Sequence, residues 1–225
     1  MRKEFLSNVS HELKTPLAVI SGYAEGLAEC VNEDAESRNY YCEVILDETE
    51  KMNRMVKQLL SLNQLEFGQE NLQMQRFDLT ELIQGMLQQM SLLLEQNQIL
   101  LEFSERVPVY VWGDEFKIEE VLMNYLSNAI HHAKGDKRIH IFYTQKEEMV
   151  RVHVYNSGEP IPELALPEIW TKFYKVDKAR TREYGGTGIG LSIVKAIMQL
   201  HKQAYGVQNH ADGVEFWFEL DKTSM

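Results

Sequence analysis

The stretch FLSNVSHELKTPLAVISGYAEGLAEC, residues 5–30, decides how the first part of this chain folds. Its apolar residues recur at alternating spacings of three and four, which is typical of an amphipathic helix that packs along a seam. The residues of this seam are Leu6, Val9, Leu13, Pro16, Ile20, Tyr23, Leu27 and Cys30. If they occupy heptad positions a and d, His11 falls at position f, on the opposite face. The sequence therefore predicts an exposed histidine in the middle of a packed helix.

A second amphipathic helix is predicted before Gly68. Its seam consists of Tyr41, Ile45, Glu48, Met52, Met55, Leu59 and Leu62. A short polar turn at residues 32–37 joins the two helices into an antiparallel hairpin. Because one hairpin has too narrow a core to stand alone, we predict a homodimer in which two hairpins form a four-helix bundle.

Helices and strands are mixed from residue 77 onward. Strands are predicted near residues 77–79, 99–103, 109–112, 138–144, 150–155, 204–209 and 214–220, and helices at 80–96, from Asp114 to 132, and at 189–201, with Thr80 as a candidate N-cap. This order predicts a two-layer α+β sandwich with helices on one face of a sheet. We therefore divide the chain into a helical hairpin, residues 1–70, and an α+β domain, residues 71–225. The polar stretch at residues 156–187 is predicted to be a functional loop, such as a lid.

Composition restricts the functions that this chain of 225 residues can have. Its net charge of -11 makes nucleic acid a poor partner, and any phosphate-binding site must carry local positive groups. No run of 18 apolar residues is present, so a membrane contact would need a segment upstream of Met1. The two cysteines, Cys30 and Cys42, are too few for a disulfide framework and are expected to be reduced packing residues.

The residues around His11 carry the most specific pattern. The string SHELKTPL, residues 10–17, resembles the phosphoacceptor box of sensor histidine kinases nearly residue for residue. The resemblance implies that His11 is the nucleophile, that Glu12 takes its proton and orients the ring, and that Thr15 helps to place water for removing phosphate from a partner. Without this string, a solvated surface histidine would be the better interpretation.

Two stretches of the α+β domain resemble boxes of the same family. In EVLMNYLSNA, residues 120–129, the polar residues are four apart on one helix face and match the N box: Asn128 is implied as a Mg²⁺ ligand, with Asn124 and Glu120 in support. The stretch GGTGIGL, residues 185–191, matches the second glycine box, whose amides and helix start would hold the phosphates of ATP through Gly186, Thr187, Gly188, Gly190 and Leu191. A glycine triplet alone also fits dinucleotide-binding folds.

The predicted lid adds aromatic and basic residues. Ile169, Phe173 and Tyr174 resemble the F box, although simple anchoring of a loop would also explain them. Basic residues cluster in the same segment, and Lys175 and Arg180 are the candidates for neutralising the triphosphate.

The first glycine box departs from the family pattern. Asn156 stands where the family has an aspartate that accepts from the adenine amino group, and Pro160 replaces a glycine two residues after Gly158. His131 replaces the usual lysine, and His132 stands where an aromatic residue often stacks on adenine. A neutral amide still accepts a hydrogen bond, but without charge assistance, so we expect weaker ATP binding rather than none.

The resemblance implies a sensor histidine kinase catalytic core that uses ATP and Mg²⁺, phosphorylates His11 and passes the phosphate to an aspartate of a response regulator, with phosphatase activity alongside. The chaperones and topoisomerases that share this fold carry a glutamate at the position of Asn124, so an ATPase is disfavoured. The alternative is a phosphatase-biased or non-catalytic scaffold with a weakened ATP site. The chain is expected to be the cytoplasmic part of an inner- or plasma-membrane sensor. Within the family, it resembles sensors of the vancomycin-resistance type.

Overall fold

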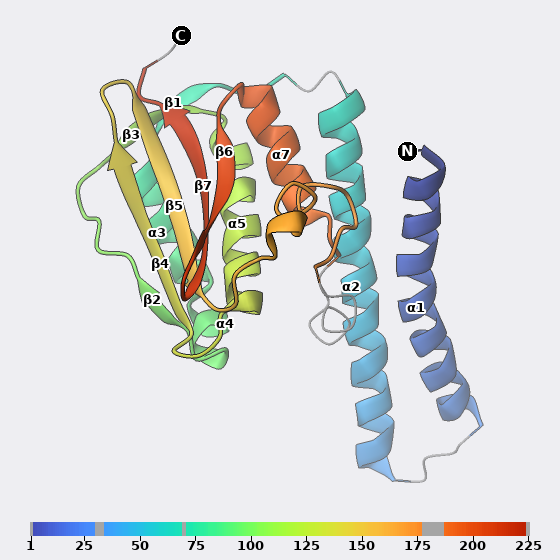
Figure 1. Cartoon of the computed structure of the whole chain (residues 1–225). Coiled ribbons are helices and arrows are strands. Elements are labelled where there is room, and N and C mark those ends of the chain that lie inside the picture. Colours follow the sequence, from blue (N-terminus) through green and yellow to red (C-terminus); the bar gives the residue numbers. More distant parts are fainter. Residues whose placement is uncertain (1, 30–33, 69–70, 177–186, 224–225) are drawn as a thin grey trace.

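A computed structural model describes residues 2–29, 34–68, 71–176 and 187–223. The hairpin consists of α1 (Arg2–Ala28) and α2 (Ala35–Phe67), which run antiparallel along one side of the molecule (Figure 1). Helix α1 continues through Pro16, and Asp34 caps α2 by accepting a hydrogen bond from the Ser37 amide at 2.7 Å. The predicted turn therefore ends too late in the sequence, because Asp34 and not Ser37 marks the end of the connection.

The strands among the remaining described residues form one seven-stranded sheet. Its strands are β1 (Gln75–Asp78), β2 (Leu100–Glu102), β3 (Tyr110–Gly113), β4 (Arg138–Gln145), β5 (Met149–Ser157), β6 (Tyr205–His210) and β7 (Gly213–Asp221). They lie in the order β1-β3-β7-β5-β4-β2, with β6 also paired to β7. Only the β2–β4 pairing is parallel among these described strands.

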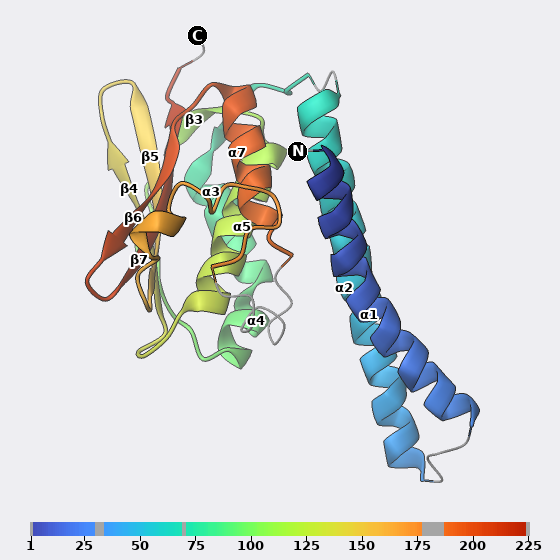
Figure 2. The same ribbon diagram turned by 45° about the vertical axis from the view of Figure 1, so that its right-hand side comes forward.

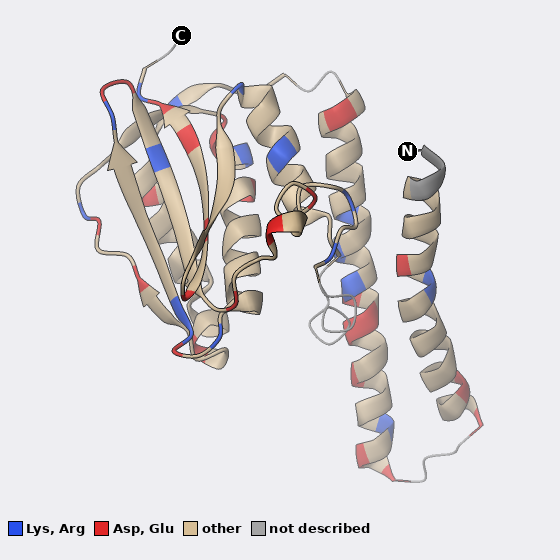
Figure 3. Ribbon diagram, viewed as in Figure 1, with Lys and Arg blue, Asp and Glu red and all other residues tan. Residues whose placement is uncertain are grey.

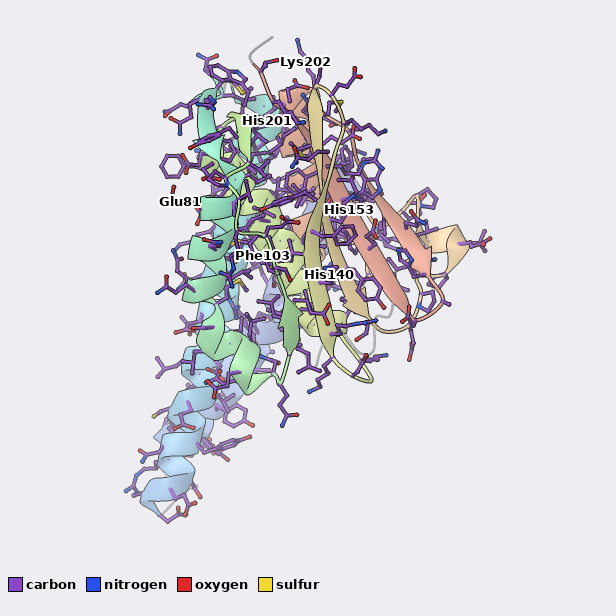
Figure 4. All side chains as sticks on the ribbon, turned by 90° about the vertical axis from the view of Figure 1, so that its left-hand side faces the viewer. Glu81, Phe103, His140, His153, His201 and Lys202 are labelled. Carbon is purple, nitrogen blue, oxygen red and sulfur yellow. The ribbon has the colours of Figure 1, made fainter. Side chains whose placement is uncertain are left out.

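The helices cover one face of this sheet, as the sequence predicts (Figure 2). They are α3 (Leu79–Gln89), α4 (Ser91–Gln96), α5 (Glu115–His132) and α7 (Gly190–His201), and the short 3-10 helix η1 (Glu163–Ala165) lies within the stretch of residues 156–187 that is predicted to be a loop. Alternation along the strands decides which side chains meet the helices: Val152 lies opposite Phe218 on the buried face, and His153 lies opposite Trp217 on the other. The labels in Figure 4 place His140 and His153 on strands β4 and β5.

Two local predictions in this region are wrong. Residues 80–96 form two helices with Met90 between them, and Asp78 rather than Thr80 caps the first one. Asp78 Oδ1 accepts from the amide of Thr80 at 2.9 Å, whereas the Thr80 hydroxyl donates to the Val107 carbonyl oxygen. The carboxylate, two residues earlier, therefore satisfies the helix start and leaves Thr80 to bond across the core.

The hairpin and the sheet domain share one hydrophobic core. Met55, Leu62 and Leu65 of α2 are buried together with the residues of the sheet domain, and α2 packs on α7. Cys42 is exposed, so its predicted packing role is wrong, and Cys30 lies outside the described residues. No described helix is both long and apolar enough to cross a membrane.

Candidate active site

The phosphoacceptor candidate lies on the solvent-facing side of α1. His11 is exposed, as predicted, while Pro16 on the opposite side of the helix is buried. Thr15 Oγ1 lies 3.5 Å from the His11 carbonyl oxygen, so the two residues are stacked one turn apart. Pro16 has no N–H to donate to the Glu12 carbonyl, which is one missing bond in the helix beside the histidine. The imidazole is therefore accessible to another domain or protein.

Helix α5 carries the predicted metal site on the face that turns away from the core. Its other face is fully buried through Ile118, Leu122, Tyr125 and Leu126, and Asp114 caps it, as predicted. Asn124 Nδ2 donates to the Glu120 carbonyl at 2.8 Å, which orients the amide oxygen outward. Asn128 lies one turn further, partly exposed.

The glycine turn before α7 lies directly beside this face. A Cβ on Gly190 would lie 2.6 Å from Asn124 Oδ1, so a larger residue would displace the Asn124 side chain. Gly188 has φ +69°, and a Cβ would meet the Phe173 backbone at 2.9 Å. Within the described residues, no side chain caps the start of α7, so its first amides can donate hydrogen bonds to an anion. The turn thus brings the candidate phosphate-binding amides next to Asn124, one of the candidate oxygen ligands of α5.

The adenine end of the predicted site is built where β5 meets the end of α5. Asn156 is 3% exposed, and its Nδ2 donates to the Ser157 carbonyl at 3.1 Å, so an adenine amino group would meet Oδ1. A Cβ on Gly158 would lie 2.7 Å from the His132 carbonyl oxygen. His131 is turned back onto its own helix, where Nδ1 lies 2.5 Å from the Ser127 carbonyl oxygen.

A buried histidine fixes the far end of α5. The amide of Asp114 donates to His201 Nε2 at 3.1 Å, and His201 Nδ1 donates to the Ile197 carbonyl at 2.9 Å. This arrangement requires the neutral ring, and burial lowers the pKa of His201 from its ordinary value. Figure 4 labels His201 and Lys202 at the end of α7. The start of α5 and the end of α7 are therefore held together.

The segment after η1 ties the nucleotide half to the hairpin. Lys175 Nζ donates to Glu12 Oε2 at 2.8 Å, Lys172 Nζ donates to Glu66 Oε2 at 2.5 Å, and the ring of Phe173 lies 5.7 Å from that of Phe5. Tyr174 is half-buried against the core. Figure 3 shows the basic residues of this segment beside the helices of the hairpin. Arg180 and Gly186 lie outside the described residues.

Helix α2 also contacts the metal and phosphate candidates. The Thr187 hydroxyl donates to Gln58 Oε1 at 2.8 Å, and the Ser61 hydroxyl donates to Glu120 Oε1 at 3.0 Å. An open cavity of about 330 Å³ lies here, lined by Gln58, Phe116, Glu119, Glu120, Met123, Asn124 and Ile193. Gln58 and Ser61 were missed at the sequence level because two polar residues on a long helix carry no signal until the partner surface is known.

The oxygen donors of α5 fit Mg²⁺ better than a softer metal. Among the described residues, no group of three or more His, Cys, Asp or Glu side chains is placed to hold a metal. Amide oxygens with one nearby carboxylate suit Mg²⁺, which keeps several of its waters and is bound together with phosphates. Of the predicted residues, the structure brings Glu120 and Asn124 to the lining of this cavity and places Gly190 against Asn124, while Thr187 bonds to Gln58 of the same lining.

Two family models match the chain. Residues 1–68 match the His Kinase A (phospho-acceptor) domain, and residues 113–224 match the histidine kinase-, DNA gyrase B- and HSP90-like ATPase domain. Sensor histidine kinase WalK of Bacillus subtilis is 36% identical over 95% of this chain and 35% of its own length. Sensor protein kinase WalK of Staphylococcus aureus is 32% identical over 89% of this chain and 48% of its own length. The chain thus spans between about a third and a half of these relatives.

Solved structures show the same arrangement of elements. Histidine kinase ThkA, in a complex with response regulator protein TrrA, superposes with a TM-score of 0.80 at 29% identity, over 98% of this chain and 61% of that one. Histidine kinase AdeS of Acinetobacter baumannii has a TM-score of 0.77 at 22% identity, over 95% of this chain and 98% of that one, and supports the fold alone.

Proposed function

Because this chain belongs to the sensor histidine kinase family, we propose that it is a catalytic core that moves the γ-phosphoryl group of ATP onto His11 and then onto an aspartate of a response regulator. The observation that carries the proposal is the position of Glu12. It lies next to the exposed His11 and binds Lys175, from the segment that leads toward the glycine turn. The acceptor helix and the nucleotide half therefore meet beside the reactive histidine.

The proposed residue roles follow from ordinary acid–base chemistry. A ring nitrogen of His11 attacks the γ-phosphorus, a nitrogen–phosphorus bond forms, the bond to the bridging oxygen breaks and ADP leaves. Glu12 accepts the ring proton, which makes the weakly nucleophilic imidazole reactive. The amides at the start of α7 and the charge of Lys175 hold the phosphates. Mg²⁺ would be held through Asn128, with Asn124 and Glu120 in support, and would supply charge neutralisation.

The adenine of ATP is proposed to bind to Asn156, Gly158, His131 and His132. This binding is proposed to be weaker than in relatives that carry an aspartate at the position of Asn156. An aspartate would accept the adenine amino group with its charge, whereas the amide of Asn156 accepts without one. Arg180 and Gly186 keep their predicted phosphate roles.

The partners are proposed from the hairpin surface and from the relatives. Leu17, Leu46 and Leu60 are each more than half exposed, which supports a second copy of the hairpin completing a four-helix bundle. ThkA was solved with a response regulator, which supports a partner of that kind here. The curated relatives are called sensors and are two to three times longer, which fits a cytoplasmic region of a membrane sensor.

The test is phosphate incorporation from γ-labelled ATP with Mg²⁺ into the wild type, His11→Gln and the matched control His140→Gln, whose histidine lies on strand β4. We expect an acid-labile, alkali-stable label in the wild type and in His140→Gln, and a loss of at least about 100-fold in His11→Gln, because the nucleophile is gone. Label that persists in His11→Gln would refute the assignment.

A second outcome would favour the scaffold alternative. If the wild type binds ATP without incorporating label, yet removes phosphate from a phosphorylated response regulator, the chain is biased toward phosphatase activity. The exposed Thr15 beside His11 and the neutral Asn156 are the observations that keep this alternative under test.

A further inference from the structure

The segment of residues 172–175 contacts the hairpin through two ion pairs whose side chains differ in their exposed fractions. Lys172 pairs with Glu66 at 2.5 Å, and these side chains are 32% and 29% exposed. Lys175 pairs with Glu12 at 2.8 Å, and there the lysine side chain is only 14% exposed while the carboxylate is 33% exposed. A charge-assisted hydrogen bond with so little solvent around the lysine is weakly screened. The Lys175–Glu12 pair is therefore the stronger candidate for an energetic role.

The position of Lys175 relative to the glycine turn is fixed. The Phe173 amide donates to the Gly188 carbonyl at 2.8 Å, and the positive φ of both residues allows their backbones to approach closely. Lys175 follows Phe173 by two residues, so it is carried on a segment that is bonded to the phosphate-binding turn. The side chain of this lysine therefore contacts the hairpin, while its backbone belongs to the segment that is bonded to the turn.

One ammonium group cannot neutralise a carboxylate and a triphosphate equally well. Resting on the proposed function, we propose that Lys175 is a positioning residue that exchanges between Glu12 and the phosphates of ATP. Without nucleotide it occupies the carboxylate that is to take the proton from His11. When ATP is bound, the lysine turns to the phosphates and the carboxylate of Glu12 becomes free for the imidazole.

Thermodynamic linkage gives this exchange a measurable consequence. If ATP weakens the Lys175–Glu12 pair, then the pair must weaken ATP binding by the same factor. Removing the charge of Glu12 should therefore tighten ATP binding, although Glu12 lies on the hairpin and outside the nucleotide site. A residue with only a structural role in holding the hairpin would not produce this result.

The experiment measures the dissociation constant of ATP with Mg²⁺ by calorimetry, in a His11→Gln background so that no phosphate is transferred. We expect Glu12→Gln to lower the constant about three- to tenfold, a range set by one partly buried ion pair. Lys175→Met should raise the constant, and Glu12→Gln should then have no further effect. Glu66→Gln is the matched control, because it removes one negative charge and one hairpin contact of the same segment; it should leave the constant unchanged.

Three results would overturn the exchange: no change in Glu12→Gln, equal tightening in Glu66→Gln, or tightening by Glu12→Gln that persists in Lys175→Met. If the His11→Gln protein does not bind ATP, both the exchange and the proposed function fail. If it binds ATP and Glu12→Gln leaves the dissociation constant unchanged, only the exchange fails.

A second readout measures the stability of the protein instead of its affinity for ATP. A double-mutant cycle of thermal unfolding between Glu12 and Lys175 should show a favourable coupling without ATP, and that coupling should disappear at saturating ATP. A coupling that is unchanged by ATP would contradict the exchange.

Discussion

The hairpin and the sheet domain differ in how completely they bury their apolar side chains. In the sheet domain, Leu122, Tyr125 and Phe218 are 0% exposed, so this domain completes its core within one chain. In the hairpin, Leu46 remains 63% exposed, and the most deeply buried residues lie where α2 meets the sheet domain. The hairpin therefore depends on neighbours for its burial: on the sheet domain on one side and, as we propose, on a second hairpin on the other.

The largest effect should come from a cavity in the core of the sheet domain. Phe218→Ala should lower the free energy of unfolding by about 3–5 kcal/mol at every protein concentration, because it leaves a cavity that no partner can fill. Leu46→Ala on the hairpin should cost less than about 1 kcal/mol in dilute protein and more in concentrated protein, because its contacts need a second copy. Urea unfolding at two concentrations measures both. A cost for Leu46→Ala that does not depend on concentration would contradict the proposed bundle.

A smaller effect should come from loosening the joint between the two regions. Leu62 is 2% exposed in the shared core, and Leu62→Ala should cost about 2–4 kcal/mol, whereas Leu60→Ala on the exposed side of the same helix should cost less. Trp112, Trp170 and Trp217 all lie in the sheet domain, so their fluorescence reports on that region, while far-ultraviolet circular dichroism also includes the hairpin. The two signals should coincide in the wild type and separate in Leu62→Ala.

If the two signals stay together in Leu62→Ala, the joint is not what couples the regions. Separation in Leu60→Ala as well would mean that any shortened side chain on α2 has this effect.

The smallest effect should be a pH dependence that belongs to the sheet domain alone. Burial lowers the folded-state pKa of His201 below its ordinary value of 6.5, so in the window beneath 6.5 the unfolded chain binds more protons. Stability should therefore fall as pH drops from 7.5 through 6.5, and it should recover as pH rises. A neutral His201 is needed to accept from the Asp114 amide.

His201→Gln should flatten the dependence of the melting temperature on pH between 7.5 and 5.5, and His140→Gln, on the open face of the sheet, should preserve it. An unchanged slope in His201→Gln would show that other groups cause the acid sensitivity. The facing charged group is Asp114, whose carboxylate accepts from the backbone amides of Gln73 and Lys117.

The predictions that came true depend on periodic or local patterns. The exposure of His11 followed from a seam spacing, the cap at Asp114 followed from a carboxylate before an apolar helix, and the layering followed from the order of elements. The predicted cap at Thr80 is wrong because Asp78 accepts hydrogen bonds from the first amides of the helix. Both residue types are common helix caps, so the residue type alone does not show which one is used. The catalytic and binding roles of the site residues stay predictions.

The contacts between the two regions had no sequence pattern at all. Lys175 was selected for its charge near a phosphate loop, and Glu12 for its place beside His11, but 163 residues separate them in the chain. Gln58 and Ser61 were not selected, because a hydroxyl or amide on a long helix is ordinary until another domain packs against it.

Helical and strand periods predict most of the elements and their buried faces without the structure, since hydrogen bonding within helices and alternation along strands are local properties of the chain. It also determined the family, through short strings whose residues act together. The structure alone shows which lysine meets which carboxylate and where α2 contacts the candidate nucleotide site. Those contacts depend on how two packed bodies fit, and that fit is a property of their surfaces rather than of any segment.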